Sequence, residues 1–135
     1  MIEFDIFYIG LQMQKELEAK LIERFPTYFK DMYGDPTQTC MAFGCECGAG
    51  WFDLIFRLCE NIEKTNPENF TIAQVKEKFG GLRFYYYGGS QEVHDLVSKA
   101  EEESYEICEN CGTREDVTSE GSWILTLCKN CRGNK

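Results

Sequence analysis

Two C-x-x-C pairs near the C-terminus constrain this chain more than any other feature of its sequence. The cysteines are Cys108, Cys111, Cys128 and Cys131, and sixteen residues separate the two pairs, as is typical of four-cysteine zinc modules. Each pair can place both sulfur atoms about 2.3 Å from one Zn²⁺ ion. Gly112 lets the backbone pass close to the first pair. Because four protein ligands leave no position for water, we expect a closed structural zinc site.

Two alternatives to zinc stay open at this point. The same tetrahedral set of thiolates can hold iron, and paired cysteines also occur as redox dithiols. A structural zinc ion supplies on the order of 10 kcal/mol of folding free energy. That amount can hold a short segment with few core residues, so we expect a zinc ribbon at 107–135 after an α+β domain at 1–106.

The remaining apolar residues predict helices and one hairpin. Hydrophobic residues make up 43% of the 135 residues and aromatic residues 14%, which is too rich for a disordered chain. Helical spacing of apolar residues predicts helices at 11–25, 51–64 and 91–106, the last one strongly acidic. Residues 70–87 read as two strands joined by a Gly80-Gly81 turn of type I′. We therefore expect helices packed on one face of a small antiparallel sheet.

A turn at Gly80-Gly81 would pair Phe79 with Leu82 and sort the hairpin side chains into two faces. The face expected to pack on the helices carries Ala73, Val75, Phe79, Leu82, Phe84 and Tyr86, with Glu77 as its polar exception. The other carries Gln74, Lys76, Lys78, Arg83, Tyr85 and Tyr87. Cations interleaved with tyrosines suit a phosphate-bearing ligand, a nucleotide base or an acidic protein patch. Alternatively, these cations pair within the chain with Glu101, Glu102 and Glu103.

Charge and the N-terminal sequence narrow the classes of function. The net charge of −9 argues against nonspecific nucleic-acid binding and against anionic membrane surfaces. The first ten residues lack the features of a secretory signal, and no apolar run approaches the ~18 residues of a membrane span. We therefore expect a cytoplasmic protein in a reducing compartment, where cysteines stay available to bind metal.

The other cysteines and the single histidine carry weaker signals. Cys40, Cys45, Cys47 and Cys59 match no common ligand spacing, so we expect buried or incidental thiols, with a second metal site as the alternative. His94 opens the acidic helix with no nucleophile beside it in the sequence, which favours a surface position over a catalytic one.

Three sequence blocks, in their order, resemble a family of small, largely uncharacterised proteins of bacteriophages and bacteria. The blocks read ECGAGWFDLIFRLCENI, VKEKFGGLRFYYYGG, and CENCG followed by a tryptophan and TLC, and the resemblance covers most of residues 45–131. It implies a cytosolic accessory protein, often phage-borne, without an established activity. Family members read Gly-Asp-Gly where this chain has Gly48-Ala49-Gly50, so any role of that aspartate is missing here.

These observations favour a noncatalytic zinc-containing binding protein, a phage-type accessory inhibitor of a host protein that acts in the host cytoplasm if it is phage-encoded. It would bind its partner through the hairpin cations and tyrosines or through the acidic helix. One alternative is a sponge that sequesters a nucleotide-type signal with the same side chains. The other is a small hydrolase that uses Glu77, Asp53 or His94 as acid or base, although no paired constellation supports it.

Overall fold

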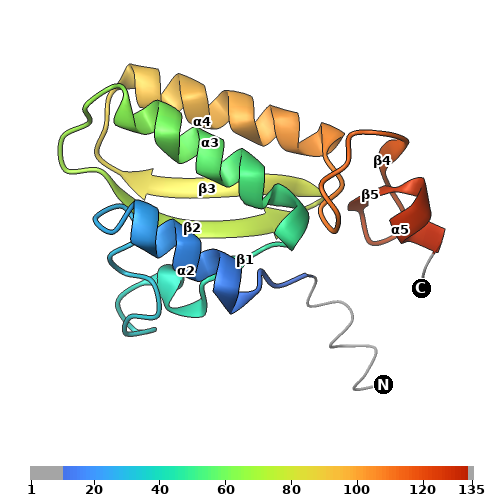
Figure 1. Cartoon of the computed structure of the whole chain (residues 1–135), viewed down its shortest axis with the longest axis horizontal. Helices are drawn as coiled ribbons and strands as arrows, with labels where there is room; N and C mark the ends of the chain where they lie inside the picture. The colour runs from blue at the N-terminus through green and yellow to red at the C-terminus, as the bar shows by residue number, and fades with distance from the viewer. Residues whose placement is uncertain (1–10, 134–135) are drawn as a thin grey trace.

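The computed structural model describes residues 11–133, which form an α+β fold with a small C-terminal ribbon (Figure 1). Its α-helices are α2 (Lys15–Arg24), α3 (Phe52–Glu63), α4 (Gln91–Glu103) and α5 (Lys129–Gly133). Its short 3₁₀ helices are η1 (Cys40–Phe43), η2 (Ala49–Trp51) and η3 (Ser104–Glu106). The three predicted helices correspond to α2, α3 and α4. Within residues 11–133, no helix combines the length and apolar character that crossing a bilayer requires.

Helix α2 begins four residues later than predicted. The amide of Met13 donates to the carbonyl oxygen of Cys45 at 3.2 Å, and the Gln12 side chain donates to the same oxygen at 2.9 Å. Gln14 is still extended, and the helix starts after it. Residues 12 and 13 are therefore held by hydrogen bonds to Cys45 and do not form a first turn of the helix.

The main sheet has three strands in the order β1 (Cys45–Glu46), β2 (Thr71–Lys78) and β3 (Gly81–Tyr87). Strands β2 and β3 form the predicted antiparallel hairpin, whereas β1 runs parallel to β2. The predicted antiparallel hairpin is therefore confirmed, and β1 adds a short parallel pair that makes the sheet mixed. A two-residue strand in a Cys- and Gly-rich stretch is too short to show the alternation that predicts strands.

The hairpin turn lies one residue earlier than predicted. Phe79 and Gly80 are its two central residues, with φ angles of 56° and 85°, as a type I′ turn requires. Gly81 instead opens β3 opposite Lys78. A Cβ atom at Gly81 would overlap the hydroxyl end of the Tyr105 side chain, so any other residue here would require that side chain to move. Phe79 is consequently 64% exposed at the tip of the hairpin and does not pack on the helices.

The new register still preserves the two predicted faces. Each cross-strand partner shifts by two residues along β3, and side chains two residues apart lie on the same face of a strand. Lys76, for example, pairs with Arg83 in place of Tyr85, which lies on the same face. A β-bulge between Ile72 and Gln74 is the one further change. It turns Ile72 into the core and leaves Ala73 only partly buried, so Ala73 was wrongly predicted as the core residue.

Helices α2, α3 and α4 lie on one side of this sheet and bury its apolar face (Figure 1). The core residues that are less than 2% exposed include Leu21, Phe29, Trp51, Ile55, Ile62, Ile72 and Leu82. The edge of β3 is closed by α4 and η3, since Glu101 accepts from the amide of Phe84 and Ser104 from that of Leu82, both at 2.9 Å. These side chains satisfy backbone groups that would otherwise be open to strand pairing.

The ribbon follows η3 and contains β4 (Val117–Glu120), β5 (Leu125–Cys128) and helix α5. Strands β4 and β5 pair antiparallel, with Val117 opposite Cys128. Arg132 of α5 ties the ribbon together by donating to the carbonyl oxygens of Thr118, at 2.7 Å, and Leu125, at 3.0 Å.

Candidate metal centre

The structure brings the four predicted ligand cysteines together. The sulfur atoms of Cys108, Cys111, Cys128 and Cys131 all lie within 4.8 Å of one another, and those of Cys111 and Cys128 are 3.8 Å apart. A tetrahedral ion with metal–sulfur distances of about 2.3 Å would separate its ligands by about 3.8 Å. This cysteine quartet can therefore hold one metal ion.

Backbone amides stabilise the thiolates within each C-x-x-C step. The amide of Cys111 donates to the sulfur of Cys108 at 3.4 Å, and the amide of Cys131 donates to that of Cys128 at 3.3 Å. Gly112 has a φ of 86° and returns its amide to the carbonyl oxygen of Cys108 at 2.9 Å. Although burial opposes ionisation, amide donors lower the pKa of Cys108 to about 7. Hydrogen-bond donors also act to lower the pKa values of Cys111 and Cys131, but burial and the neighbouring thiols outweigh them and raise both.

A glycine-rich loop of the main domain receives the metal loop, residues 108–112. Glu109 is 1% exposed, and its carboxylate accepts from the amide of Gly48 at 2.9 Å. Its carbonyl oxygen accepts from the amide of Gly50 at 2.8 Å. A Cβ atom at Gly50 would overlap the carbonyl oxygen of Cys108, so only glycine permits this approach. The two glycines are thus required to dock the metal loop.

Burial also raises the pKa of Glu109 to about 7, and the nearby carboxylate of Glu77 acts in the same direction. Glu77 faces the apolar side of the sheet, as predicted, and there it accepts from the amide of Gly80 at 2.8 Å. The amide of Gly80 in the turn is therefore the hydrogen-bond donor to the Glu77 carboxylate.

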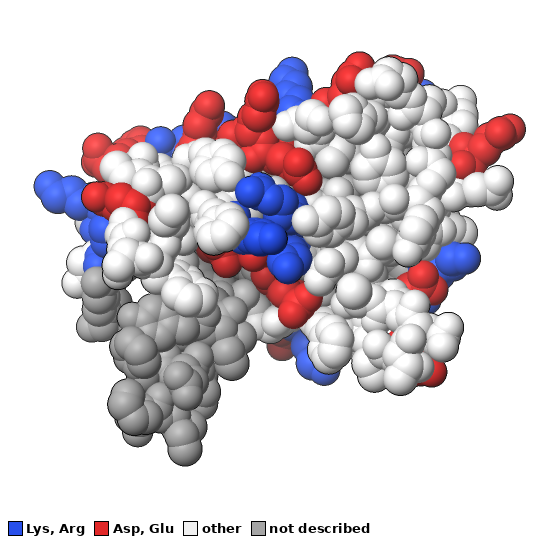
Figure 2. Space-filling model, turned by 180° about the vertical axis from the view of Figure 1, so that it is seen from behind, with Lys and Arg blue, Asp and Glu red and all other residues white. Residues whose placement is uncertain are grey.

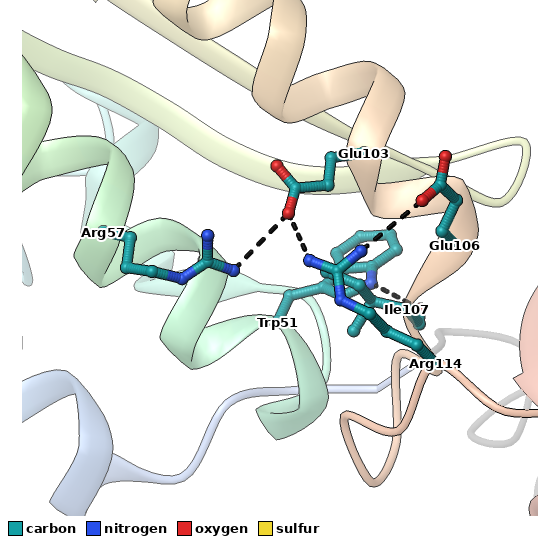
Figure 3. A network of polar contacts seen from close by, with 6 residues as sticks. All are labelled: Trp51, Arg57, Glu103, Glu106, Ile107 and Arg114. Carbon is teal, nitrogen blue, oxygen red and sulfur yellow. Dashed lines mark hydrogen bonds and ion pairs between the residues drawn. The ribbon is translucent and has the colours of Figure 1, made fainter.

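Trp51 makes a further contact between the main domain and the chain entering the metal loop. Its side chain is fully buried, and its indole N–H donates to the carbonyl oxygen of Ile107 at 3.0 Å (Figure 3). The residue before the first ligand is thereby fixed to the start of α3.

Around this contact, a surface network joins two helices to the ribbon (Figure 3). Glu103, at the end of α4, pairs with Arg57 of α3 at 3.6 Å and with Arg114 just after the metal loop. Arg114 also reaches Glu106 at 3.4 Å. Partial burial acts to raise the pKa of Glu103, but the guanidinium groups of Arg114 and Arg57 outweigh it and lower this pKa. Such exposed pairs contribute only about 0–1 kcal/mol each, so the network adds orientation more than stability.

The ribbon also contacts the hairpin tip. The buried hydroxyl of Thr126, on β5, donates to the carbonyl oxygen of Gly80 at 2.5 Å and bonds the hydroxyl of Ser119 at 2.6 Å. The side chain of Ile124 lies against Gly80. The hairpin turn is therefore held by Glu77 of β2 and by Thr126 of the ribbon.

The remaining cysteines are placed as buried or incidental thiols. Cys45, Cys47 and Cys59 are fully buried, and burial raises the pKa of each thiol, whereas Cys40 is exposed. In the part of the chain that the structure describes, the cysteine quartet is the one group of three or more His, Cys, Asp or Glu side chains near enough to share a metal ion.

The residues predicted as alternative acids or bases do not enter such a group. The His94 side chain is 63% exposed on α4, in agreement with the predicted surface position, and Asp53 is exposed in the first turn of α3. Glu77 is engaged with the hairpin turn.

Five predicted binding residues share the sheet face opposite the helices; we call this set the basic tyrosine face. It consists of Lys76, Lys78, Arg83, Tyr85 and Tyr87. Tyr85 is 45% exposed and Tyr87 67% exposed. Figure 2 shows a compact group of basic side chains near the middle of the view from behind, with acidic side chains around it.

Among residues 11–133, none of the three cations of this face lies within 4 Å of a carboxylate oxygen. Of the three acids expected to pair with them, Glu101 is engaged with the edge of β3 and Glu103 with two arginines. Glu102 is exposed on α4 and lies beyond 4 Å of these cations. The nearest acid by register is Glu46, which stands opposite Lys76 on β1. Within the described part of the chain, the face thus keeps positive charge that no carboxylate pairs with.

Sequence reasoning missed the residues that dock the metal loop, namely Gly48, Gly50, Trp51, Glu109 and Thr126. Two signals for them were present in the sequence, an acid between two ligand cysteines and a Gly-x-Gly-Trp block. Their contacts join segments far apart in sequence, so the sequence alone does not bring them together.

Comparison with protein-family models, with curated proteins and with solved structures finds no match to this chain. The site is therefore interpreted from its own geometry.

Proposed function

We propose that this chain is a noncatalytic, zinc-containing binding protein that engages its partner through the basic tyrosine face. The observation that carries the proposal is that, among residues 11–133, no carboxylate pairs with the three cations of this sheet face. The apolar face is buried by helices, and the edge of β3 is closed by Glu101 and Ser104. Of the sheet surfaces formed by the described residues, the basic tyrosine face is therefore the one proposed to contact another molecule.

The metal in this proposal is Zn²⁺, and its role is structural. Four thiolates, two of them buried, form a closed and soft ligand set, which suits zinc and leaves no position for a reacting water. The ion would hold the ribbon, and the ribbon in turn contacts the hairpin tip through Thr126.

The partner in this proposal is a protein, and the chain is a phage-type accessory inhibitor acting in the cytoplasm of a host cell. The resemblance of its sequence blocks to phage proteins supports this setting. The shape of the surface supports a protein over a nucleotide, because small ligands bind in concave sites. Two hollows, of about 480 Å³ beside α5 and about 330 Å³ between residues 65–69 and 88–90, are lined by none of the five residues of the basic tyrosine face.

Charge reversal tests the proposed surface. The tagged protein with Lys78→Glu and Arg83→Glu should lose a specifically captured host protein, while the matched double variant with Lys20→Glu and Lys99→Glu should keep it. Lys20 and Lys99 are exposed on α2 and α4, so both variants change the net charge equally. Capture that survives reversal of Lys78 and Arg83 would exclude this face. A thermal shift with nucleotides but no captured protein would favour the sponge instead.

A further inference from the structure

We infer that the partner of the basic tyrosine face is an acidic protein segment that also presents an apolar side chain, and that Phe79 is the apolar contact at one end of the site. This inference rests on the proposed function and specifies the chemistry of the partner.

Phe79 is placed where folding alone does not favour it. The first central position of a type I′ turn requires a positive φ, which Asn, Asp and Gly adopt most easily. The Phe79 ring is nevertheless 64% exposed, with the ammonium group of Lys78 lying 5.6 Å from its centroid. A bulky residue in a rare backbone conformation that buries little of its own surface points to a role in contact with another molecule.

The structure holds the backbone of the turn that carries this aromatic side chain. The amide of Gly80 donates to Glu77, and its carbonyl oxygen accepts from the buried Thr126. Ile124 packs beside Gly80 and is itself 39% exposed, so it extends the apolar surface of the tip. A contact residue whose backbone is held in place before binding loses less conformational freedom when the complex forms.

The cations beside this tip specify the charge of the partner. Lys78 adjoins Phe79 in sequence, and Lys76 and Arg83 stand opposite each other in the next part of the hairpin. A carboxylate that docks here feels these nearby cations, since charges beyond about 8–10 Å are screened at physiological salt. A long polyanion such as RNA would also meet the rest of a chain with a net charge of −9. An acidic protein segment therefore fits better than a nucleic acid.

A displayed library of random peptides, panned on the metal-loaded full chain, tests this inference. We expect enriched peptides to combine Asp or Glu with an aromatic or aliphatic residue. Phe79→Asn should weaken their binding about tenfold or more, in the range of a strong interface contact, while the thermal midpoint stays equal or rises because Asn tolerates the turn. The control Phe43→Asn changes a phenylalanine that is 59% exposed elsewhere and should leave binding unchanged.

The outcomes separate this inference from the proposed function. Peptides whose binding is lost with Lys78→Glu and Arg83→Glu but kept with Phe79→Asn would overturn the role of Phe79 and leave the proposed face in place. Displacement of the peptides by a single-stranded RNA oligonucleotide would overturn the choice of a protein segment. Failure of the library to enrich any peptide that depends on Lys78 and Arg83 would overturn both.

Discussion

Glu109 links the metal loop to the main domain through a single buried side chain. It lies between two ligand cysteines, yet its carboxylate points away to the amide of Gly48. Burial makes its charged form unfavourable, which is why its pKa rises to about 7. The hydrogen bond to Gly48 is the contact by which this carboxylate joins the metal loop to the main domain.

Glu109→Ala should lower the free energy of unfolding by about 1–3 kcal/mol, because the buried amide of Gly48 would lose its acceptor. Glu109→Gln keeps an acceptor oxygen and should cost less than half as much. Denaturant unfolding of the metal-loaded proteins measures both. Glu115→Ala, on the exposed side of the ribbon, is the control and should stay within about 0.5 kcal/mol of wild type. Equal stability of all three variants would show that the contact contributes nothing.

At the scale of elements, local chemistry determined what could be predicted. The C-x-x-C spacing predicts the quartet because each pair is constrained by its own short turn, and apolar periodicity predicts the three long helices. The hairpin register could not be predicted, because a Gly80-Gly81 turn needs no bulky residue at a positive φ, whereas the observed turn places Phe79 there. Gly81 instead pairs in β3, where Tyr105 packs on it from a distant part of the chain.

The loop between β1 and α3 is the element most sensitive to substitution. Gly50→Ala should destabilise the protein by about 1–3 kcal/mol, because the added methyl group would overlap backbone atoms of Cys108 that cannot move without displacing a metal ligand. Thermal unfolding of the metal-loaded protein measures the change. Gly133→Ala, where nothing lies within 4 Å of the added atom, is the matched control. A Gly50→Ala variant as stable as this control would contradict the close docking of the metal loop.

At the scale of the whole molecule, the ribbon and the main domain hold each other. Glu109 and Trp51 fix the beginning of the ribbon, and Thr126 on β5 holds the hairpin tip that carries Phe79. Loss of the metal should therefore disturb the proposed binding surface as well as the ribbon.

Removal of the metal with a chelator should unfold the ribbon, because zinc supplies on the order of 10 kcal/mol in sites of this kind. Hydrogen exchange should then show faster exchange at the amides of Gly48 and Gly50, which donate to Glu109 of the metal loop, and little change at Leu58 in the middle of α3. Slow exchange at Gly48 and Gly50 after complete metal removal would show that the ribbon folds and docks without its ion.

Native mass spectrometry of the purified protein can show whether one structural zinc ion binds the cysteine quartet. We predict one Zn²⁺ per chain, lost with Cys128→Ser and retained with Cys40→Ser, which replaces an exposed cysteine outside the quartet. A chain without metal, a chain with iron, or a zinc ion that survives Cys128→Ser unchanged would contradict it.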